Sequence, residues 1–247
     1  MPIVFCDVDG TLRRGKNGAV SGETIEAASR FIYNGNTLYL ITGAPVAHLP
    51  RGWKEWTSGA YVELGGVLLL PTGEMRVCGE EALPAIERLR ARLGIEVDDG
   101  WAQLPDGLGS VIVDGGRSAS LTLLTGTPPH YPGLVGDAAL EDLVPIVQKA
   151  GLQSILGGDT VYRWLDCVLS GKETAVQPFL GKDSVFYLGD DRNDVGAMKL
   201  PGVIPIGFAN SISRIRELAQ KGGTYIDLPG PEGGVAEFFR RLNNGKL

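Results

Sequence analysis

The chain has 247 residues, of which 43% are hydrophobic and 21% charged, and its formal net charge is −6. These values are typical of a globular protein with one α/β domain and space for a smaller second one, and they argue against disorder. The acidic balance argues against general nucleic-acid binding, which needs a basic face, although a local basic pocket or a metal ion can still hold a small anion. The apolar run 2–6 ends at once in Asp7 and so is not expected to be a signal peptide, and no apolar stretch approaches the length needed to span a bilayer.

Cysteine and histidine are scarce in this sequence. The three cysteines, Cys6, Cys78 and Cys167, form no CxxC pair, which predicts buried, reduced thiols in a cytoplasmic protein. The two histidines, His48 and His130, are too few for a metal site built from several imidazoles. Any hydrolytic chemistry would therefore depend on carboxylates, lysine or hydroxyl groups.

The first third of the chain alternates short apolar runs with an amphipathic stretch, which is typical of βαβ units and a parallel sheet. Ser21 is a suitable N-cap for a helix whose apolar face would contain Ile25, Ala28 and Ile32. We expect a helix at 22–33, strands at 2–6, 37–42 and 60–62, and a hairpin formed by 67–70 and 75–78.

The middle of the chain has a different character, with mixed helix and strand signals around a loop rich in Gly and Pro at 125–136. We expect helices at 80–93 and 137–150, a strand at 118–124, and a hairpin formed by 153–156 and 160–165. This α+β segment is predicted to be an inserted domain spanning 80–167.

The βαβ pattern returns in the last third. We expect helices at 172–180, 193–199, 211–220 and 234–242, and strands at 184–188, 203–206 and 224–226. The predicted fold is therefore α/β, with a doubly wound, Rossmann-like parallel-sheet core formed by 1–79 and 168–247 and an inserted α+β cap domain.

Polar side chains follow the expected core strands where each strand ends. The residues at these ends are Asp7, Asp9, Thr42, Asp190, Asn193 and Asp194, and Lys172 opens a neighbouring helix. Because ligands bind at the carboxyl ends of strands in open parallel sheets, we expect these side chains to meet at one edge. Clustered carboxylates repel one another unless a cation lies between them, and an all-oxygen ligand set favours Mg²⁺ over Zn²⁺.

Four segments resemble the motifs of the haloacid dehalogenase-like (HAD) hydrolases. The matching segments are DVDGTL at 7–12, LITG at 40–43, Lys172 in SGKETA at 170–175, and GDDRNDVGAM at 189–198. Their order and spacing make the resemblance specific. Two positions depart from the pattern: Ala44 stands where arginine often follows Thr-Gly, and Leu64 replaces asparagine in a Glu-Asn-Gly motif.

The insert lies between the second and third motifs, which resembles the C2 cap class. Within that class, the layout is similar to the Cof-like, sucrose-phosphate, trehalose-phosphate and mannosyl-phosphoglycerate phosphatases. The resemblance implies a Mg²⁺-dependent phosphatase of a small phosphorylated metabolite, either a sugar phosphate or a compound of the phosphoglycerate or phosphoglycolate type. From the charge and the lack of a long apolar stretch we expect no nucleic-acid or membrane partner, and we expect a monomer or a small homo-oligomer.

The resemblance also implies roles for individual residues. Asp7 would be the nucleophile that forms an aspartyl-phosphate, and Asp9 would act as general acid and then as general base. Mg²⁺ would be held by the Asp7 carboxylate, the Asp9 backbone carbonyl and Asp190, with Asp194 either a direct ligand or a support for the ligands. The residues implied to cradle the phosphate are Thr42, Gly43, Lys172 and Asn193.

Two other functions are compatible with the same motifs. One is a phosphomutase of the phosphomannomutase type, which would need several cap arginines to converge on a bisphosphate. The other is a non-catalytic binding protein on this fold, although the intact set of acidic residues and lysine argues against it.

Several basic residues have open roles. Arg117 and Arg163 in the insert could read a second anionic group of the substrate, or could be ordinary solvated residues. Arg13, Arg14 and Lys16 could form a flap over the site, with the same solvated alternative. The sequence alone does not name the substrate.

Overall fold

The computed structural model describes residues 1–15, 18–78, 81–181 and 183–247. The chain divides into two compact units. Unit 1 comprises Met1–Arg76 and Gly171–Leu247, and unit 2 comprises Val77–Ser170. Two sequence-based expectations, the start of a helix at Glu80 and the flap role of Lys16, lie outside the described residues.

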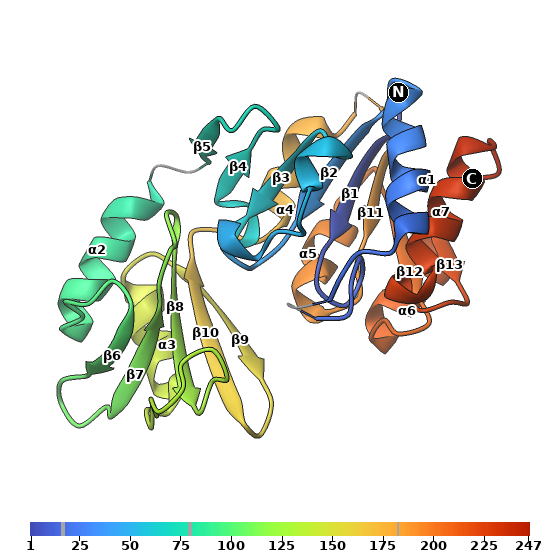
Figure 1. Cartoon of the computed structure of the whole chain (residues 1–247). Helices are drawn as coiled ribbons and strands as arrows, with labels where there is room; N and C mark the ends of the chain where they lie inside the picture. The colour runs from blue at the N-terminus through green and yellow to red at the C-terminus, as the bar shows by residue number, and fades with distance from the viewer. Residues whose placement is uncertain (16–17, 79–80, 182) are drawn as a thin grey trace. The chain divides into compact units, whose positions relative to one another are not determined.

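Unit 1 contains a mixed sheet of eight strands (Figure 1). The strands are β1 (Ile3–Asp7), β2 (Thr37–Ile41), β3 (Gly59–Val62), β4 (Val67–Leu69), β5 (Met75–Val77), β11 (Val185–Leu188), β12 (Val203–Phe208) and β13 (Thr224–Ile226). Their order is β13-β12-β11-β1-β2-β3-β4-β5, parallel from β13 to β3. The expected parallel core is confirmed, and β1 lies near its centre, where both neighbouring strands hold its carboxyl end.

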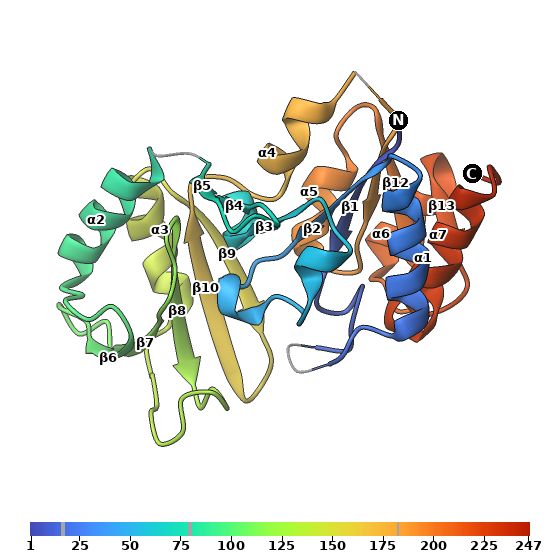
Figure 2. The same ribbon diagram turned by 45° about the horizontal axis from the view of Figure 1, so that its top comes forward.

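Helices cover both faces of this sheet (Figures 1 and 2). The helices are α1 (Gly22–Tyr33), α4 (Glu173–Val176), α5 (Val195–Met198), α6 (Ser213–Gly222) and α7 (Gly234–Asn243). α1 and α7 lie side by side, and Phe186 of β11 packs edge-on against Phe238 of α7. The next residue along β11, Tyr187, belongs to the cluster that α4, α5 and α6 form on the opposite face. Successive residues of β11 therefore point to opposite faces of the sheet and are buried on both, as in a central strand of a parallel sheet.

Helix α1 has the predicted bounds, and the Ser21 side chain accepts from the backbone N–H of Thr24 as an N-cap. The predicted core face was wrong in part. The structure buries Thr24, Ala27, Ala28 and Phe31, whereas Ile25 and Ile32 are only partly buried. Phe31 packs against Phe239 of α7, so the orientation of α1 depends on a helix far along the chain.

Unit 2 has its own antiparallel sheet of five strands, in the order β6-β7-β8-β10-β9. The strands are β6 (Gly100–Gln103), β7 (Ser110–Asp114), β8 (Ser120–Gly126), β9 (Gln153–Gly158) and β10 (Tyr162–Val168). Helices α2 (Ala82–Leu93) and α3 (Leu140–Lys149) pack on one face, where they meet alternate apolar residues of β7, β8 and β10 (Figure 2). The expected α+β composition is confirmed.

Strands β6 and β7 were not predicted from the sequence, because each is short and lies in a glycine-rich context. Helix α3 also begins three residues later than expected. The Asp137 carboxylate accepts from the backbone N–H and the hydroxyl of Ser110 at 2.6 and 2.7 Å, so it binds strand β7 and does not cap the helix.

Two further expectations concern cysteines and membrane spans. Cys6 and Cys167 are buried as predicted, but Cys78 is exposed because it follows β5, the edge strand of the sheet. Within the described residues, no helix has both the length and the apolar character needed to cross a bilayer.

Candidate active site

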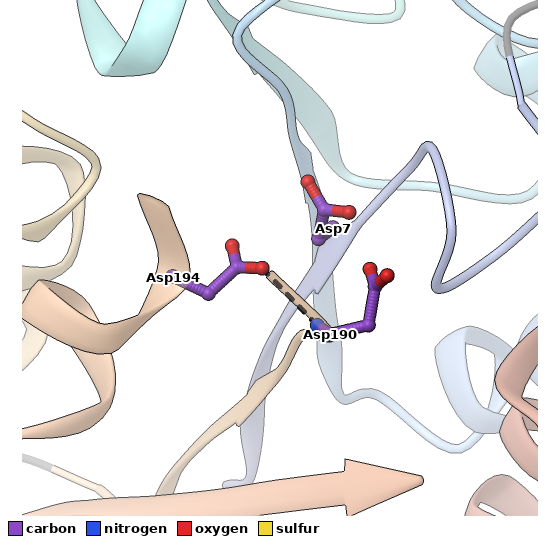
Figure 3. Close-up of side chains that lie close together, drawn as sticks. All are labelled: Asp7, Asp190 and Asp194. Carbon is purple, nitrogen blue, oxygen red and sulfur yellow. Dashed lines mark hydrogen bonds between the residues drawn. The ribbon is translucent and has the colours of Figure 1, made fainter. Parts of the chain in front are cut away.

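Three carboxylates converge at the carboxyl edge of the unit 1 sheet (Figure 3). Asp7 ends β1, Asp190 follows β11, and Asp194 ends the 3-10 turn Arg192–Asp194. One oxygen of each lies within 4.8 Å of the others. Strands β1 and β11 are neighbours in the sheet and run parallel, which brings together residues that are more than 180 positions apart in the sequence.

Lys172 lies among these carboxylates and is completely buried. Its ammonium donates to Asp7 Oδ1 at 2.5 Å, to Asp194 Oδ1 at 2.7 Å and to Asn193 Oδ1 at 3.4 Å. Burial alone would lower the pKa of Lys172, but the two carboxylates outweigh it and raise the pKa above its usual value. Lys172 is therefore a cation at neutral pH.

Asp194 is also completely buried, and both of its oxygens are engaged. Oδ1 accepts from Lys172 and from the hydroxyl of Tyr187 at 2.8 Å, and Oδ2 accepts from the backbone N–H groups of Asp190 and Asp191, each at 3.1 Å. One of these bonds is drawn in Figure 3. Because its two oxygens already accept four hydrogen bonds, Asp194 is better suited to positioning its neighbours than to binding a cation directly.

The side chain of Asp190 is held in place by a residue of the first motif, at 7–12. The buried hydroxyl of Thr11 donates to Asp190 Oδ1 at 2.7 Å. Burial raises the pKa of Asp190 to about 6; the Thr11 hydrogen bond opposes this rise and the Asp194 charge adds to it. Gly10 has a φ of +96°, and a Cβ at this position would lie 2.2 Å from Asp190 Oδ2. Glycine is required here both by the backbone conformation and by the close approach.

The charges of the cluster are unbalanced, with three carboxylates and one lysine. Burial raises the pKa of Asp7 well above its usual range; Lys172 opposes the rise, and the charges of Asp194 and Asp190 add to it. Among the described residues, no group donates to Oδ2 of Asp7 or of Asp190. Two carboxylate oxygens without donors, in a cluster that lacks positive charge, fit a hard divalent cation such as Mg²⁺.

Thr42 and Gly43 lie beside this cluster, at the end of β2. The Thr42 hydroxyl oxygen accepts from the backbone N–H of Ala44 at 3.1 Å, and its own proton finds no acceptor among the described residues. A Cβ on Gly43 would lie 3.3 Å from Leu64 and 4.0 Å from the Asn193 amide nitrogen. The second and fourth motifs therefore come close together here.

Asp9 lies in the turn that follows β1, with its side chain 25% exposed. Its Oδ1 accepts from Arg13 Nε at 2.9 Å. Arg13 is buried and also donates to the backbone carbonyl of His48 at 2.6 Å, so it does not form an exposed flap. Arg14 is exposed and pairs with Glu232.

The two insert arginines both form ion pairs inside unit 2. Arg117 is buried and donates through two nitrogens to Asp114 Oδ2 at 3.1 and 2.7 Å. Arg163 forms a two-bond pair with Glu141 at the surface.

Sequence reasoning missed the contributions of Thr11 and Tyr187. Thr11 is part of the first motif, so its polar character in a buried turn was a usable signal. Tyr187 lies within an apolar strand, where a tyrosine is an ordinary packing residue. Its hydrogen bond to Asp194 depends on the turn that brings Asp194 back against β11, and the sequence pattern does not encode that contact.

The chain matches no protein-family model, and no curated protein matches it. Solved structures do match. BT1666 of Bacteroides thetaiotaomicron, described as a HAD phosphatase, aligns with a TM-score of 0.68 at 17% identity, covering 100% of this chain and 96% of that one. TM0651 of Thermotoga maritima gives 0.66 at 17% identity, covering 98% and 97%.

A third match is BT4131, described as a HAD subclass IIB sugar phosphatase, with a TM-score of 0.62 at 14% identity and full coverage of both chains. At such identities the likeness concerns the fold. This chain therefore has the fold of the HAD-superfamily phosphatases, with a Rossmann-like core and an inserted α+β unit.

Proposed function

We propose that the protein is a Mg²⁺-dependent phosphatase that hydrolyses a small phosphorylated metabolite through an aspartyl-phosphate on Asp7. The observation that carries this proposal is the buried cluster in which the Lys172 ammonium lies 2.5 Å from Asp7 Oδ1, beside Asp190. A lysine and neighbouring carboxylates around the Asp7 carboxylate suit phosphoryl transfer, in which positioning and charge stabilisation supply most of the catalysis.

In the first step, a carboxylate oxygen of Asp7 bonds to phosphorus as the bond from phosphorus to the leaving oxygen breaks. The bonding electrons go to the leaving oxygen, which takes a proton from Asp9 and departs as an alcohol. Burial raises the pKa of Asp7, and Lys172 opposes this rise and so favours the ionised, reactive form of the carboxylate.

In the second step, a water oxygen attacks the phosphorus of the aspartyl-phosphate while Asp9, now a carboxylate, takes the water proton. The bond from phosphorus to the Asp7 oxygen breaks and inorganic phosphate leaves. Both side chains then return to their starting protonation states, so that one residue serves as acid and then as base.

Asp7, Asp190 and the backbone carbonyl of Asp9 would hold Mg²⁺, with Asp194 fixing the backbone of the Asp190 loop. When bound, the ion neutralises charge on the phosphoryl oxygens. The phosphate would be cradled by Thr42, whose hydroxyl proton finds no acceptor among the described residues, and by Gly43, Lys172 and Asn193.

Within this proposal, unit 1 is the catalytic core and unit 2 is a C2-type cap that selects the substrate. Arg117 and Arg163 are already ion-paired with Asp114 and Glu141, which favours a neutral polyhydroxyl moiety over a second anionic group. A sugar phosphate is therefore the preferred substrate class, ahead of phosphoglycolate and phosphoglycerates. The name of BT4131 as a sugar phosphatase points in the same direction.

The test measures phosphate release from p-nitrophenyl phosphate, a panel of sugar phosphates, phosphoglycolate and glycosyl-phosphoglycerates. Each compound is assayed with Mg²⁺ and with EDTA, for the wild type and for Asp7→Asn. We expect Mg²⁺-dependent release that Asp7→Asn abolishes, with sugar phosphates the best substrates. Absence of release by folded protein that still binds Mg²⁺ would overturn the proposal in favour of a mutase or a binding role.

A separate measurement tests the metal site. Mg²⁺ should raise the melting temperature of the wild type, because a ligand that binds only the folded state stabilises it by mass action. Asp190→Asn should lose this shift. Asp191→Asn, a matched change at the exposed neighbouring residue, should keep it.

A further inference from the structure

The contact between Asp9 and Arg13 fixes the orientation of the Asp9 carboxylate. Arg13 Nε donates to Asp9 Oδ1 at 2.9 Å. Within the described residues, Oδ2 of Asp9 accepts no hydrogen bond, and a quarter of the side chain is open to solvent. One oxygen of the carboxylate is therefore held, and the other is left available.

Arg13 is itself fixed through both its backbone and its guanidinium group. The Arg13 backbone N–H donates to the Val8 carbonyl at 3.0 Å, and its carbonyl accepts from the Gly10 N–H at 2.9 Å. Its Nη2 donates to the backbone carbonyl of His48 at 2.6 Å, in the segment that follows β2. Arg13 thus links the turn after β1 to the loop after β2, and Asp9 lies against this link.

An ordinary surface ion pair is mobile and contributes little to stability. The adjacent Arg14 provides that comparison, because its side chain is 72% exposed and pairs with Glu232 at the surface. The Arg13 side chain is only 6% exposed. A guanidinium is buried at a cost unless its partners are well placed, and a fixed planar group orients a carboxylate better than a flexible ammonium does.

We infer that Arg13 is a positioning residue for proton transfer: it holds Oδ1 of Asp9 and directs Oδ2 toward the reacting oxygen. This inference rests on the proposed phosphatase function. Its consequence is a dependence on the leaving group. An alcohol must receive a proton as it leaves, whereas p-nitrophenolate is a stable anion and leaves without one. Arg13 should therefore matter for the first kind of substrate and much less for the second.

The experiment compares Arg13→Met and Arg13→Lys with the matched surface control Arg14→Met. For each protein, kcat/KM is measured with p-nitrophenyl phosphate and with the alkyl or sugar phosphate that the wild type hydrolyses best. General acid catalysis contributes about 10²- to 10⁴-fold, so misplacing the acid should reduce kcat/KM for the alkyl ester by about 10- to 100-fold in Arg13→Met. With p-nitrophenyl phosphate the change should stay within about 2-fold. Arg14→Met should match the wild type with both substrates.

Arg13→Lys retains the charge but cannot bind Asp9 and the His48 carbonyl with the same fixed geometry. We expect a smaller loss that is again confined to the alkyl ester, and this variant decides the question if Arg13→Met does not fold. In an Asp9→Asn background, Arg13→Met should cause no further loss, because the proton donor is already absent.

Equal losses with both substrates would assign Arg13 a structural role and overturn the inference. So would an undiminished alkyl-ester activity, or a further large loss in the Asp9→Asn background. These results require a wild type that hydrolyses phosphate esters, so they are distinct from failure of the phosphatase proposal itself.

Discussion

Lys172 and Asp194 form an ion pair, 2.7 Å long, in which both side chains are completely shielded from solvent. Lys172 also bonds Asp7, and Asp194 fixes the backbone at Asp190 and Asp191. The pair therefore connects the proposed nucleophile to the loop that would hold the metal. It is the structural centre of the site.

Removing the lysine should destabilise the fold as well as the site. Breaking a buried pair from one side leaves an uncompensated charge and typically costs about 3–5 kcal/mol. Lys172→Met should lower the free energy of unfolding by about this amount in urea titrations followed by circular dichroism. Lys221→Met, at an exposed position in the last turn of α6, should change it by less than about 0.5 kcal/mol. A Lys172→Met variant as stable as the wild type would contradict the role given to this pair.

Replacing the proposed nucleophile should have the opposite effect on stability. Burial raises the pKa of Asp7 despite Lys172. In the absence of metal, the ionised carboxylate therefore raises the free energy of the folded state relative to the unfolded chain. Asp7→Asn should therefore stabilise the protein in EDTA by about 0.5–2 kcal/mol, the range of typical stabilising substitutions. With Mg²⁺ the order should reverse, because only the wild type has the full ligand set. Unfolding titrations under both conditions test this, and a destabilised Asp7→Asn in EDTA would show that the ion pair with Lys172 outweighs burial.

The outline of the site was predictable because each motif residue follows an apolar strand or opens a helix. The expected parallel sheet alone places Asp7, Thr42 and Asp190 at one edge. Contacts made by single side chains were not predictable in the same way. Arg13 lies in a turn, where no periodic pattern predicts which side chains are buried. Its burial depends on the His48 carbonyl, which another loop supplies.

The same distinction holds for the fold. The bounds of α1 were encoded locally by Ser21, but its buried face depends on α7. In unit 2, the side chain of Asp137 could equally cap a helix or bind a strand. Its position relative to Ser110 decided the outcome, and Ser110 belongs to β7, a strand that was itself missed.

Gly10 is predicted to be required for its lack of a side chain as well as for its backbone conformation. A Cβ in Gly10→Ala would fall 2.2 Å from Asp190 Oδ2, so Asp190 must move. We expect loss of the Mg²⁺-induced melting shift together with loss of activity. Gly15→Ala is the matched control, since Gly15 also has a positive φ, of +60°, but among the described residues, chain neighbours aside, no atom lies within 4 Å of the added carbon. Both variants should lose about 1 kcal/mol from backbone strain, and only Gly10→Ala should lose the metal response.

The acid sensitivity of unit 2 should depend on Asp137. Hydrogen bonds from the Ser110 hydroxyl and backbone N–H lower the pKa of this carboxyl from its usual value of 3.8. The folded state therefore binds a proton less readily than the unfolded chain does. The stability that Asp137 contributes is present above pH 3.8 and is lost as the pH falls through the lowered value.

Asp137→Asn should therefore be less stable than the wild type at neutral pH, and the difference between the two should shrink as the pH falls below about 4. Urea midpoints measured from pH 7 down to about pH 3 test this expectation. Asp106→Asn serves as a control, because the Asp106 carboxylate is exposed and accepts no hydrogen bond from the described residues. Its stability curve should run parallel to that of the wild type. A constant gap between Asp137→Asn and wild type across this pH range would mean that the contacts with Ser110 act through hydrogen-bond geometry and not through the carboxylate charge.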